Sequence, residues 1–191
     1  MELTEKQQEK YNEIFFKYDC DEEQAEEIFL GLEKGLDVSI YAKPDFNEGQ
    51  MRQIRLGLEE GLEVSIYAKP EFNSYQMFQI RYGLLNNIDV TIYAKTEFYA
   101  EQMKQIMLGL EKGIDISIYF NPEFNYRQME QIRKGLEENL DVSIYSKLVF
   151  DYLQMEQIRF GLENNIDVSS YLNPNIDWEE MNQIRETLEN K

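Results

Sequence analysis

Histidine is absent from this 191-residue chain, and only one cysteine, Cys20, is present. Without histidine, Ser–His–Asp and Cys–His catalytic arrangements are excluded, and a zinc site would have only carboxylates as common ligands. A single cysteine excludes a disulfide framework within the chain. The phosphate-binding patterns GxxxxGK[ST] and GxGxxG are also absent. These absences predict a protein that is not an enzyme and that binds no cofactor or metal.

Long hydrophobic runs and basic residues are scarce as well. No apolar run approaches the roughly 18 residues that span a membrane, and the opening MELTEKQQEK does not resemble a signal peptide. Lys and Arg number 19 against 37 Asp and Glu, which gives a net charge of −18. Such a field repels nucleic acids and anionic membranes and favours basic partners. We expect a cytoplasmic protein that contacts neither membrane nor nucleic acid directly.

A unit of 26 residues repeats along the chain without insertion or deletion. It is clearest in FNEGQMRQIRLGLEEGLEVSIYAKPE (46–71) and FNSYQMFQIRYGLLNNIDVTIYAKTE (72–97). Further copies occupy 98–123, 124–149 and 150–175, an eroded copy occupies 20–45, and a truncated copy occupies 176–191. One such unit cannot bury its own apolar face, and stacked neighbours bury it instead.

The repeat predicts an all-α fold, an α-solenoid of about seven units, each with one four-turn helix and one short helix. We expect a single elongated domain over residues 1–191. It would consist of an N-terminal capping helix (1–19), six full repeats (20–175) and a C-terminal capping half-repeat (176–191).

Start and stop signals define the long helix of each unit. Asn47 and Gln50 have the spacing of a capping box, and Phe46 and Met51 that of a hydrophobic staple. Gly61 provides the left-handed residue that ends a helix, and every full copy has Gly or Asn there. The predicted helix therefore runs over residues 48–60. A glycine also recurs inside it, at Gly57 and equivalents, and predicts close approach between helices despite costing about 1 kcal/mol relative to alanine.

The second segment of the unit, LEVSIYAKPE, has two interpretations. Val, Ile and Tyr favour a strand. Glu63, which is Asp in the other full copies, can cap a short helix that Pro70 ends, and we favour the helix. The recurring tyrosine, Tyr67 and its equivalents, is predicted to lie in or near the core.

A row of arginines recurs at one position of the long helix. Stacked together, they would bind a phosphate-rich ligand. The alternative, which we favour, is structural ion pairing with the recurring acids from Asp37 to Asp167, at one acid per arginine in each unit. The arginines are Arg55, Arg81, Arg133, Arg159 and Arg185.

The first copy is the most acidic, with eight acids against two bases over residues 20–45. Its acids lack the Gly and Glu spacing of a calcium-binding EF-hand loop, and those of the first turn complement the helix dipole. Cys20 occupies the staple position and is predicted to pack. The candidate partner-binding glutamates are Glu22, Glu23, Glu26 and Glu27.

The third copy has an aromatic set of its own. Tyr75, Phe78 and Tyr82 follow helical spacing away from the apolar stripe of Met77, Ile80 and Leu84. They are interpreted as extra packing between neighbouring units or as a binding patch, because aromatic residues anchor interfaces. A second aromatic row, interpreted mainly as packing, comprises Tyr126, Tyr152 and Trp178.

The segment SIYAKPDFNEGQMRQIRLGLEEGLEVS, residues 39–65, resembles short helical repeats of phage and conjugative-element proteins in low-GC Gram-positive bacteria. The resemblance covers residues 20–191. It implies a mobile-element setting in a bacterial host cell, where small acidic proteins inhibit defences such as CRISPR nucleases. No catalytic residue is carried over from it.

Three functions follow as expectations. The first is a non-catalytic acidic inhibitor that occupies the nucleic-acid groove of a basic, nucleic-acid-binding protein, as an anti-CRISPR or other anti-defence protein would. The second is a protein-interaction scaffold whose charge serves only solubility. The third is a solenoid that binds a phosphate-containing ligand through its arginine row. The oligomeric state is not indicated by the sequence.

Overall fold

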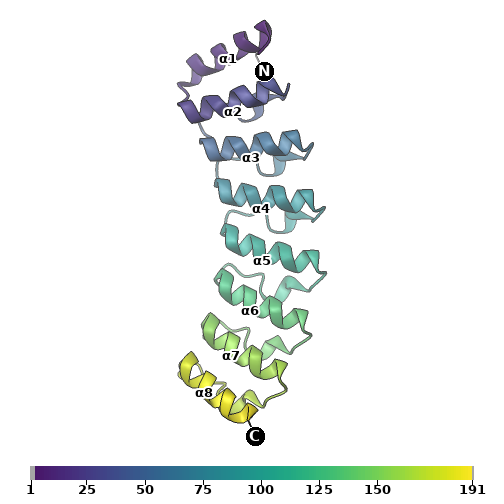
Figure 1. Ribbon diagram of the computed structural model, residues 1–191, viewed down its shortest axis with the longest axis vertical. Helices are drawn as coiled ribbons and strands as arrows, with labels where there is room; N and C mark the ends of the chain where they lie inside the picture. Colours follow the sequence, from purple (N-terminus) through teal and green to yellow (C-terminus); the bar gives the residue numbers. More distant parts are fainter. Residues whose placement is uncertain (1–2, 191) are drawn as a thin grey trace. The chain divides into compact units, whose positions relative to one another are not determined.

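The 26-residue unit folds as a 12-residue α-helix followed by a three-residue 3₁₀ helix in the computed structural model, which describes residues 3–190 (Figure 1). The long helices are α1 (Glu5–Tyr18), α2 (Glu22–Glu33), α3 (Glu48–Glu59), α4 (Ser74–Leu85), α5 (Ala100–Glu111), α6 (Tyr126–Glu137), α7 (Tyr152–Glu163) and α8 (Trp178–Glu189). The 3₁₀ helices are η1 (Val38–Ile40), η2 (Val64–Ile66), η3 (Val90–Ile92), η4 (Ile116–Ile118), η5 (Val142–Ile144) and η6 (Val168–Ser170). The part of the chain described contains no β-strand.

The chain divides into two compact units, Met1–Met103 and Lys104–Lys191, with the boundary inside α5. In the first unit α1, α2, α3 and α4 pack in series, each on the next, and in the second unit α6, α7 and α8 do the same. Because successive long helices pack in series within each unit, the predicted all-α repeat fold of about 26 residues per unit is confirmed.

The predicted capping box begins the helix of most repeats. In α3 the Gln50 N–H donates to Asn47 Oδ1 (3.0 Å), and the Asn47 N–H donates to Gln50 Oε1 (2.9 Å). The same box begins α1, α2, α4, α6 and α7, and in α8 the Asp177 half of it is formed. The glutamine has a second role that the sequence did not reveal. Gln50 Nε2 donates to the Phe72 carbonyl of the next repeat (2.6 Å), which fastens one helix start to the following one.

The stop signals also hold. Gly61 (φ +70°) and Asn87 (φ +57°) adopt the left-handed conformation that follows each long helix. The segment after them is helical, so the strand interpretation is wrong, although the helix is a single 3₁₀ turn. Asp37 and its equivalents cap it, as Asp37 Oδ1 accepts from the Ser39 N–H (3.1 Å).

The recurring glycine makes room for the 3₁₀ helix of its own repeat, so the predicted close approach joins the two helices of one unit. A Cβ on Gly57 would lie 1.9 Å from the Tyr67 hydroxyl oxygen. That hydroxyl donates to the Gln53 carbonyl (3.1 Å), one turn before the glycine on the same helix. The tyrosine thus ties the 3₁₀ helix onto its own long helix. All six equivalents are fully buried, which confirms the predicted core position: Tyr41, Tyr67, Tyr93, Tyr119, Tyr145 and Tyr171.

Candidate partner-binding surface

The arginine row lies inside the repeat stack, where it links neighbouring helices. Arg81 Nε donates to Gln53 Oε1 of the preceding repeat (3.1 Å), and its Nη1 pairs with Glu60 (2.6 Å). Within the second unit, Arg159 Nε likewise donates to Gln131 Oε1 of the preceding repeat (2.9 Å), whereas its Nη1 pairs with Glu163, four residues on in its own helix. Because these guanidiniums are buried and satisfied by protein groups, the row offers no phosphate site.

The ion pairs are structural, as favoured, but their predicted partners were wrong. Arg55 pairs with Glu59 of its own helix and Glu27 of the preceding one, rather than with the recurring aspartates. The aspartates are occupied at the 3₁₀ helices. Hydrogen bonds from the Ser39 side chain and backbone lower the pKa of Asp37, and those from Ser117 lower the pKa of Asp115.

The four candidate glutamates divide between the interior and the surface. Glu27 is buried, and its Oε2 accepts from Arg55 Nε (2.6 Å), so its carboxylate is not available to a partner. The acidic composition of this turn suggests that all four glutamates are exposed. Successive side chains of a helix point about 100° apart, however, and this turns Glu27 toward the interior. Glu22, Glu23 and Glu26 are exposed, and within residues 3–190 they form no ion pair.

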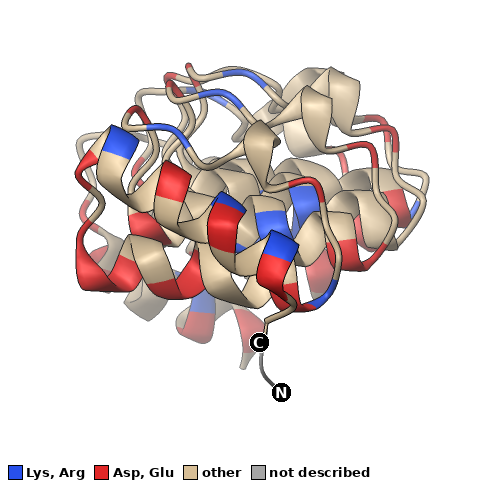
Figure 2. Ribbon diagram, turned by 90° about the horizontal axis from the view of Figure 1, so that it is seen from above, with Lys and Arg blue, Asp and Glu red and all other residues tan. Residues whose placement is uncertain are grey.

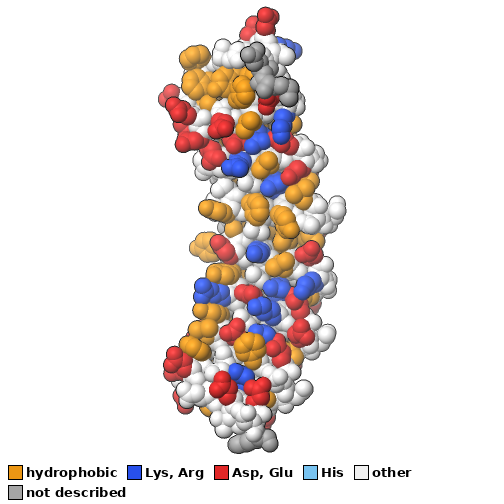
Figure 3. All heavy atoms as spheres, viewed as in Figure 1, with side chains coloured by type: hydrophobic (Ala, Val, Ile, Leu, Met, Phe, Trp, Pro, Cys, Tyr) orange, Lys and Arg blue, Asp and Glu red, His pale blue; other side chains and the backbone are white. Residues whose placement is uncertain are grey.

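Two of these exposed glutamates line a groove between α1 and α2, which we call the first groove. Its volume is about 400 Å³. One wall is formed by Tyr11 and Phe15, whose rings stack with centroids 6.1 Å apart. Phe29 meets Tyr11 edge to face at 6.2 Å. The lining residues are Tyr11, Phe15, Glu22, Ala25, Glu26 and Phe29. Hydrophobic side chains gather over α1 and α2 beside acidic ones in Figure 3.

The aromatic candidates lie together on the outer face of α4. Tyr75 is 75% exposed and Tyr82 45% exposed, and the Phe78 and Tyr82 rings stack at 6.1 Å. The interpretation as packing between units therefore does not account for them. Leu85, also exposed, extends the stripe by one more turn and was not singled out from the sequence. The sequence does mark Leu85 as unusual. In the full repeats 46–71, 124–149 and 150–175, the equivalent residue is a glutamate that pairs with the arginine four residues before it.

A second groove, of about 520 Å³, separates α3 from α4 along this stripe. Tyr75 and Phe78 form part of one wall, and the Arg81 guanidinium lies 5.7 Å from the centre of the Phe78 ring. Arg52 lies on the opposite wall. The second groove therefore carries two cations and one carboxylate, that of Glu48, whereas the first carries two carboxylates and no cation.

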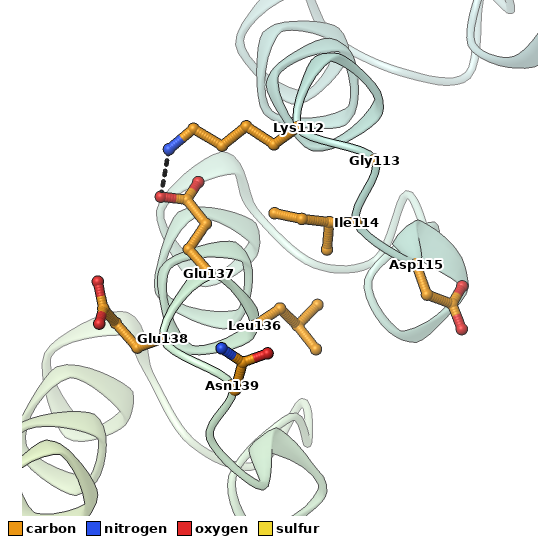
Figure 4. A pocket seen from close by; sticks show the side chains of 8 residues that line it. All are labelled: Lys112, Gly113, Ile114, Asp115, Leu136, Glu137, Glu138 and Asn139. Atoms are coloured by element: carbon orange, nitrogen blue, oxygen red, sulfur yellow. Dashed lines mark hydrogen bonds and ion pairs between the residues drawn. The ribbon is translucent and has the colours of Figure 1, made fainter.

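The second unit has a groove of a different kind, at the ends of α5 and α6 (Figure 4). Its volume is about 540 Å³, and Lys112 reaches across it to Glu137 (2.6 Å). Burial opposes the charge on Glu137, and the hydrogen bonds from Lys112 and Arg133 outweigh burial and lower its pKa. Asp115 and Glu138 point away from the groove in Figure 4. Lys112 and Glu137 neutralise each other across the groove, so we assign it a structural role.

The second aromatic row also lies in this unit. Arg127 Nη1 donates to the Tyr152 hydroxyl (2.6 Å), and the guanidinium lies 4.7 Å from the Tyr152 ring centre and 5.6 Å from that of Tyr126. Arg127 therefore bridges Tyr126 and Tyr152, which supports the packing interpretation for these two members of the row, while Trp178 is exposed. Cys20 is buried, and burial raises the pKa of its thiol.

The described residues contain neither a membrane-spanning helix nor a metal-binding cluster. No helix between residues 3 and 190 has the length and apolar content to cross a bilayer. Over the same stretch, no cluster of three or more Cys, Asp or Glu residues has the arrangement to hold a metal ion. Comparison with known proteins found no matching family, no curated relative and no similar solved structure.

Proposed function

We propose that this chain is a non-catalytic protein-binding repeat protein, and specifically an acidic inhibitor that occupies the nucleic-acid groove of a basic partner. A CRISPR nuclease or another defence protein of a bacterial host is the partner class that fits. The observation that carries the proposal lies in the first unit. There, Glu22, Glu23 and Glu26 of α2, which form no ion pair within residues 3–190, and an uncovered aromatic stripe on α4 belong to one series of packed helices.

The net charge of −18 gives the chain its acidic character. Five of the 19 basic residues are the arginines of the row, which are bonded to glutamate and glutamine side chains of the chain itself. Acidic residues are correspondingly more widespread than basic ones along the ribbons of Figure 2. Carboxylates and aromatic rings together imitate the phosphates and bases that a nucleic-acid site binds, because such sites combine cations with stacking surfaces.

The aromatic stripe favours a second candidate, the interaction scaffold. Helix α4 contains no acid, and its outer face is apolar along its length. Uncovered patches of this kind mark protein-binding sites. In that case α4 alone binds the partner, and the charge of α2 serves solubility.

Capture of a partner from bacterial lysate, with matched variants, separates the two functions. The charge variant is Glu22→Lys, Glu23→Lys and Glu26→Lys, and the aromatic variant is Tyr75→Ala, Phe78→Ala and Tyr82→Ala. Reversal of Glu101, Glu130 and Glu156 to lysine provides a control with the same change in net charge. The captured protein is then purified for affinity measurements.

Nucleic-acid mimicry predicts that the charge variant loses about tenfold or more in affinity, that added salt weakens the complex, and that duplex DNA or RNA competes for the partner. The control should bind nearly as the natural chain does. A complex unaffected by salt, competitor and charge reversal, yet lost in the aromatic variant, would replace mimicry by the scaffold. A chain that carries the charge and the aromatic changes together gives the background of the capture. If the natural chain captures no protein above this background, both functions are rejected.

A further inference from the structure

The first groove differs from the second at the position where the repeat normally places an arginine. Glu22, Glu26 and Phe29 of α2 occupy the same repeat positions as Ser74, Phe78 and Arg81 of α4, two repeats later. Both sets line the groove in front of their own helix. In the second groove this position supplies the Arg81 guanidinium. In the first groove the equivalent residue is Phe29, so this position supplies an aromatic ring in place of a guanidinium.

The carboxylates around the first groove have no cation of their own to neutralise them. Arg55, the first member of the arginine row along the chain, pairs with Glu27 and Glu59. Glu22 and Glu26 form no ion pair with any residue in the stretch 3–190. Two exposed carboxylates thus border a groove walled by three aromatic rings, and its charge is complementary to a cation from outside.

We infer that the first groove binds an arginine side chain presented by an exposed segment of a basic protein. The guanidinium would stack on the Tyr11, Phe15 and Phe29 rings and pair with Glu22 and Glu26. Five of the other six copies have their own arginine at the Phe29 position, and the copy 98–123 has Met107. Arginine fits better than lysine because its planar group both stacks on aromatic faces and binds carboxylates through two parallel hydrogen bonds. This inference deepens the proposed function and rests on it, since it names the side chain that the acidic surface recognises.

The direct test uses the full chain and a short capped peptide of alternating glycine and arginine, titrated by calorimetry and by NMR of the aromatic side chains. Shifts confined to the rings of Tyr11, Phe15 and Phe29 are expected. The same peptide with citrulline, which keeps the shape and removes the charge, should bind at least about tenfold more weakly. A lysine peptide should fall between the two.

Two variants test the site itself. Phe29→Arg places in this groove the arginine that Arg55 and Arg81 provide at the same position of the next two repeats. This variant should fold as the natural chain does, by circular dichroism and melting temperature, and lose peptide binding. The second variant, Glu22→Gln with Glu26→Gln, should weaken binding about tenfold or more. Its control, Glu130→Gln with Glu156→Gln, makes the same change of net charge in the second unit and should change binding by less than about threefold.

Equal binding of the citrulline peptide, unchanged binding by Phe29→Arg, or equal loss in the control pair would each overturn the inference. Its failure is distinguishable from that of the proposed function. If the peptide does not bind but a captured partner remains sensitive to charge reversal on α2, the function stands and this site does not. If the peptide binds the groove and no partner is captured, the site stands without the function.

Discussion

Helices α2 and α4 occupy equivalent places in the first unit, and their inward faces are built alike. Ile28 and Ile80 are both buried, and each helix is joined to a tyrosine of its following 3₁₀ helix. Their outward faces differ completely. At equivalent positions α2 has Glu23, Glu26, Leu30 and Glu33, whereas α4 has Tyr75, Phe78, Tyr82 and Leu85.

The contrast shows which positions the repeat holds fixed and which it leaves free. Residues that join a helix to its neighbour or to its own 3₁₀ helix recur because a change there affects two elements. Outer positions contact solvent, so they change from copy to copy without disturbing the stack. The residues proposed to bind a partner therefore lie among the positions that vary between copies rather than in the shared motif.

The largest effect is expected at the shared glycine. Gly31→Ala and Gly83→Ala would place a Cβ 1.9 and 2.0 Å from the hydroxyls of Tyr41 and Tyr93. Alanine gains about 1 kcal/mol in helix propensity, but displacing a buried, hydrogen-bonded tyrosine costs more, so a net loss of roughly 3 kcal/mol is expected. Denaturant unfolding measures it, and α2 and α4 should respond equally.

A double variant tests the cause of that loss. Removing the hydroxyl in Gly83→Ala with Tyr93→Phe takes away the closest atom, so part of the stability should return. If the double variant is as unstable as the sum of the two single ones, the contact between Cβ and hydroxyl is not the reason.

The second prediction concerns the acceptors of the arginine row. Helix α2 provides the Glu27 carboxylate to Arg55, whereas α3 provides the Gln53 amide to Arg81. Glu27→Ala removes a buried carboxylate from Arg55 and should cost about 3 kcal/mol. Gln53→Ala removes a neutral acceptor from Arg81, which keeps Glu60, and should cost about 1 kcal/mol. Glu27→Gln installs the residue that every later copy has and should be nearly neutral in denaturant unfolding. A large loss there would mean that the charge itself is required.

Much of the fold could be predicted because its signals are local. A capping box such as Asn47 with Gln50 and a left-handed stop such as Gly61 act within one turn, and the repeat presents each signal several times. The partners of buried polar groups were harder to predict, because they depend on the distance between repeats. Arg55 has acids available in both segments of the unit, and only the structure shows that Glu27 and Glu59 hold it.

The exposure of the candidate residues was predicted in part, and their role in binding stays a prediction. Tyr75, Phe78 and Tyr82 broke the repeat pattern and lie exposed, as a binding patch requires. Glu27 was misplaced, although its signal was available: the later copies have Gln at that position, next to a core isoleucine. Phe29 also departs from the repeat, because five other copies have arginine at its position, and this departure marks the first groove in the sequence. The single elongated domain and the mobile-element origin stay predictions.

The third prediction compares two equivalent positions at the ends of α3 and α4. Glu59 of α3 pairs with Arg55, whereas α4 has Leu85 at that position. Burial opposes the charge on Glu59, and the hydrogen bonds from Lys34 and Arg55 outweigh burial and lower its pKa. The folded state therefore binds fewer protons than the unfolded chain, and the stabilisation is present above about pH 4.5 and lost as the pH falls below it.

Glu59→Gln should accordingly lower stability at neutral pH by about 1 kcal/mol and flatten its decline in acid. Leu85→Gln, at the equivalent position of α4, should leave the pH dependence as it is. Urea unfolding at a series of pH values measures both. An unchanged acid limb in Glu59→Gln would show that other carboxyls account for it.

The smallest effect is expected where the shared interior itself varies, at the tyrosine hydroxyl. Tyr145 donates to the Gln131 carbonyl (3.1 Å), whereas the buried Tyr171 hydroxyl has no hydrogen-bond partner in the described structure. Burial raises the pKa of Tyr171 to about 12, which keeps the hydroxyl protonated at neutral pH. Tyr145→Phe should therefore cost about 1 kcal/mol, while Tyr171→Phe, which removes an unsatisfied group, should be neutral or slightly stabilising. Equal losses in urea unfolding would mean that the last hydroxyl finds a partner in solution, and that the interior is more uniform than the contrast between α2 and α4 implies.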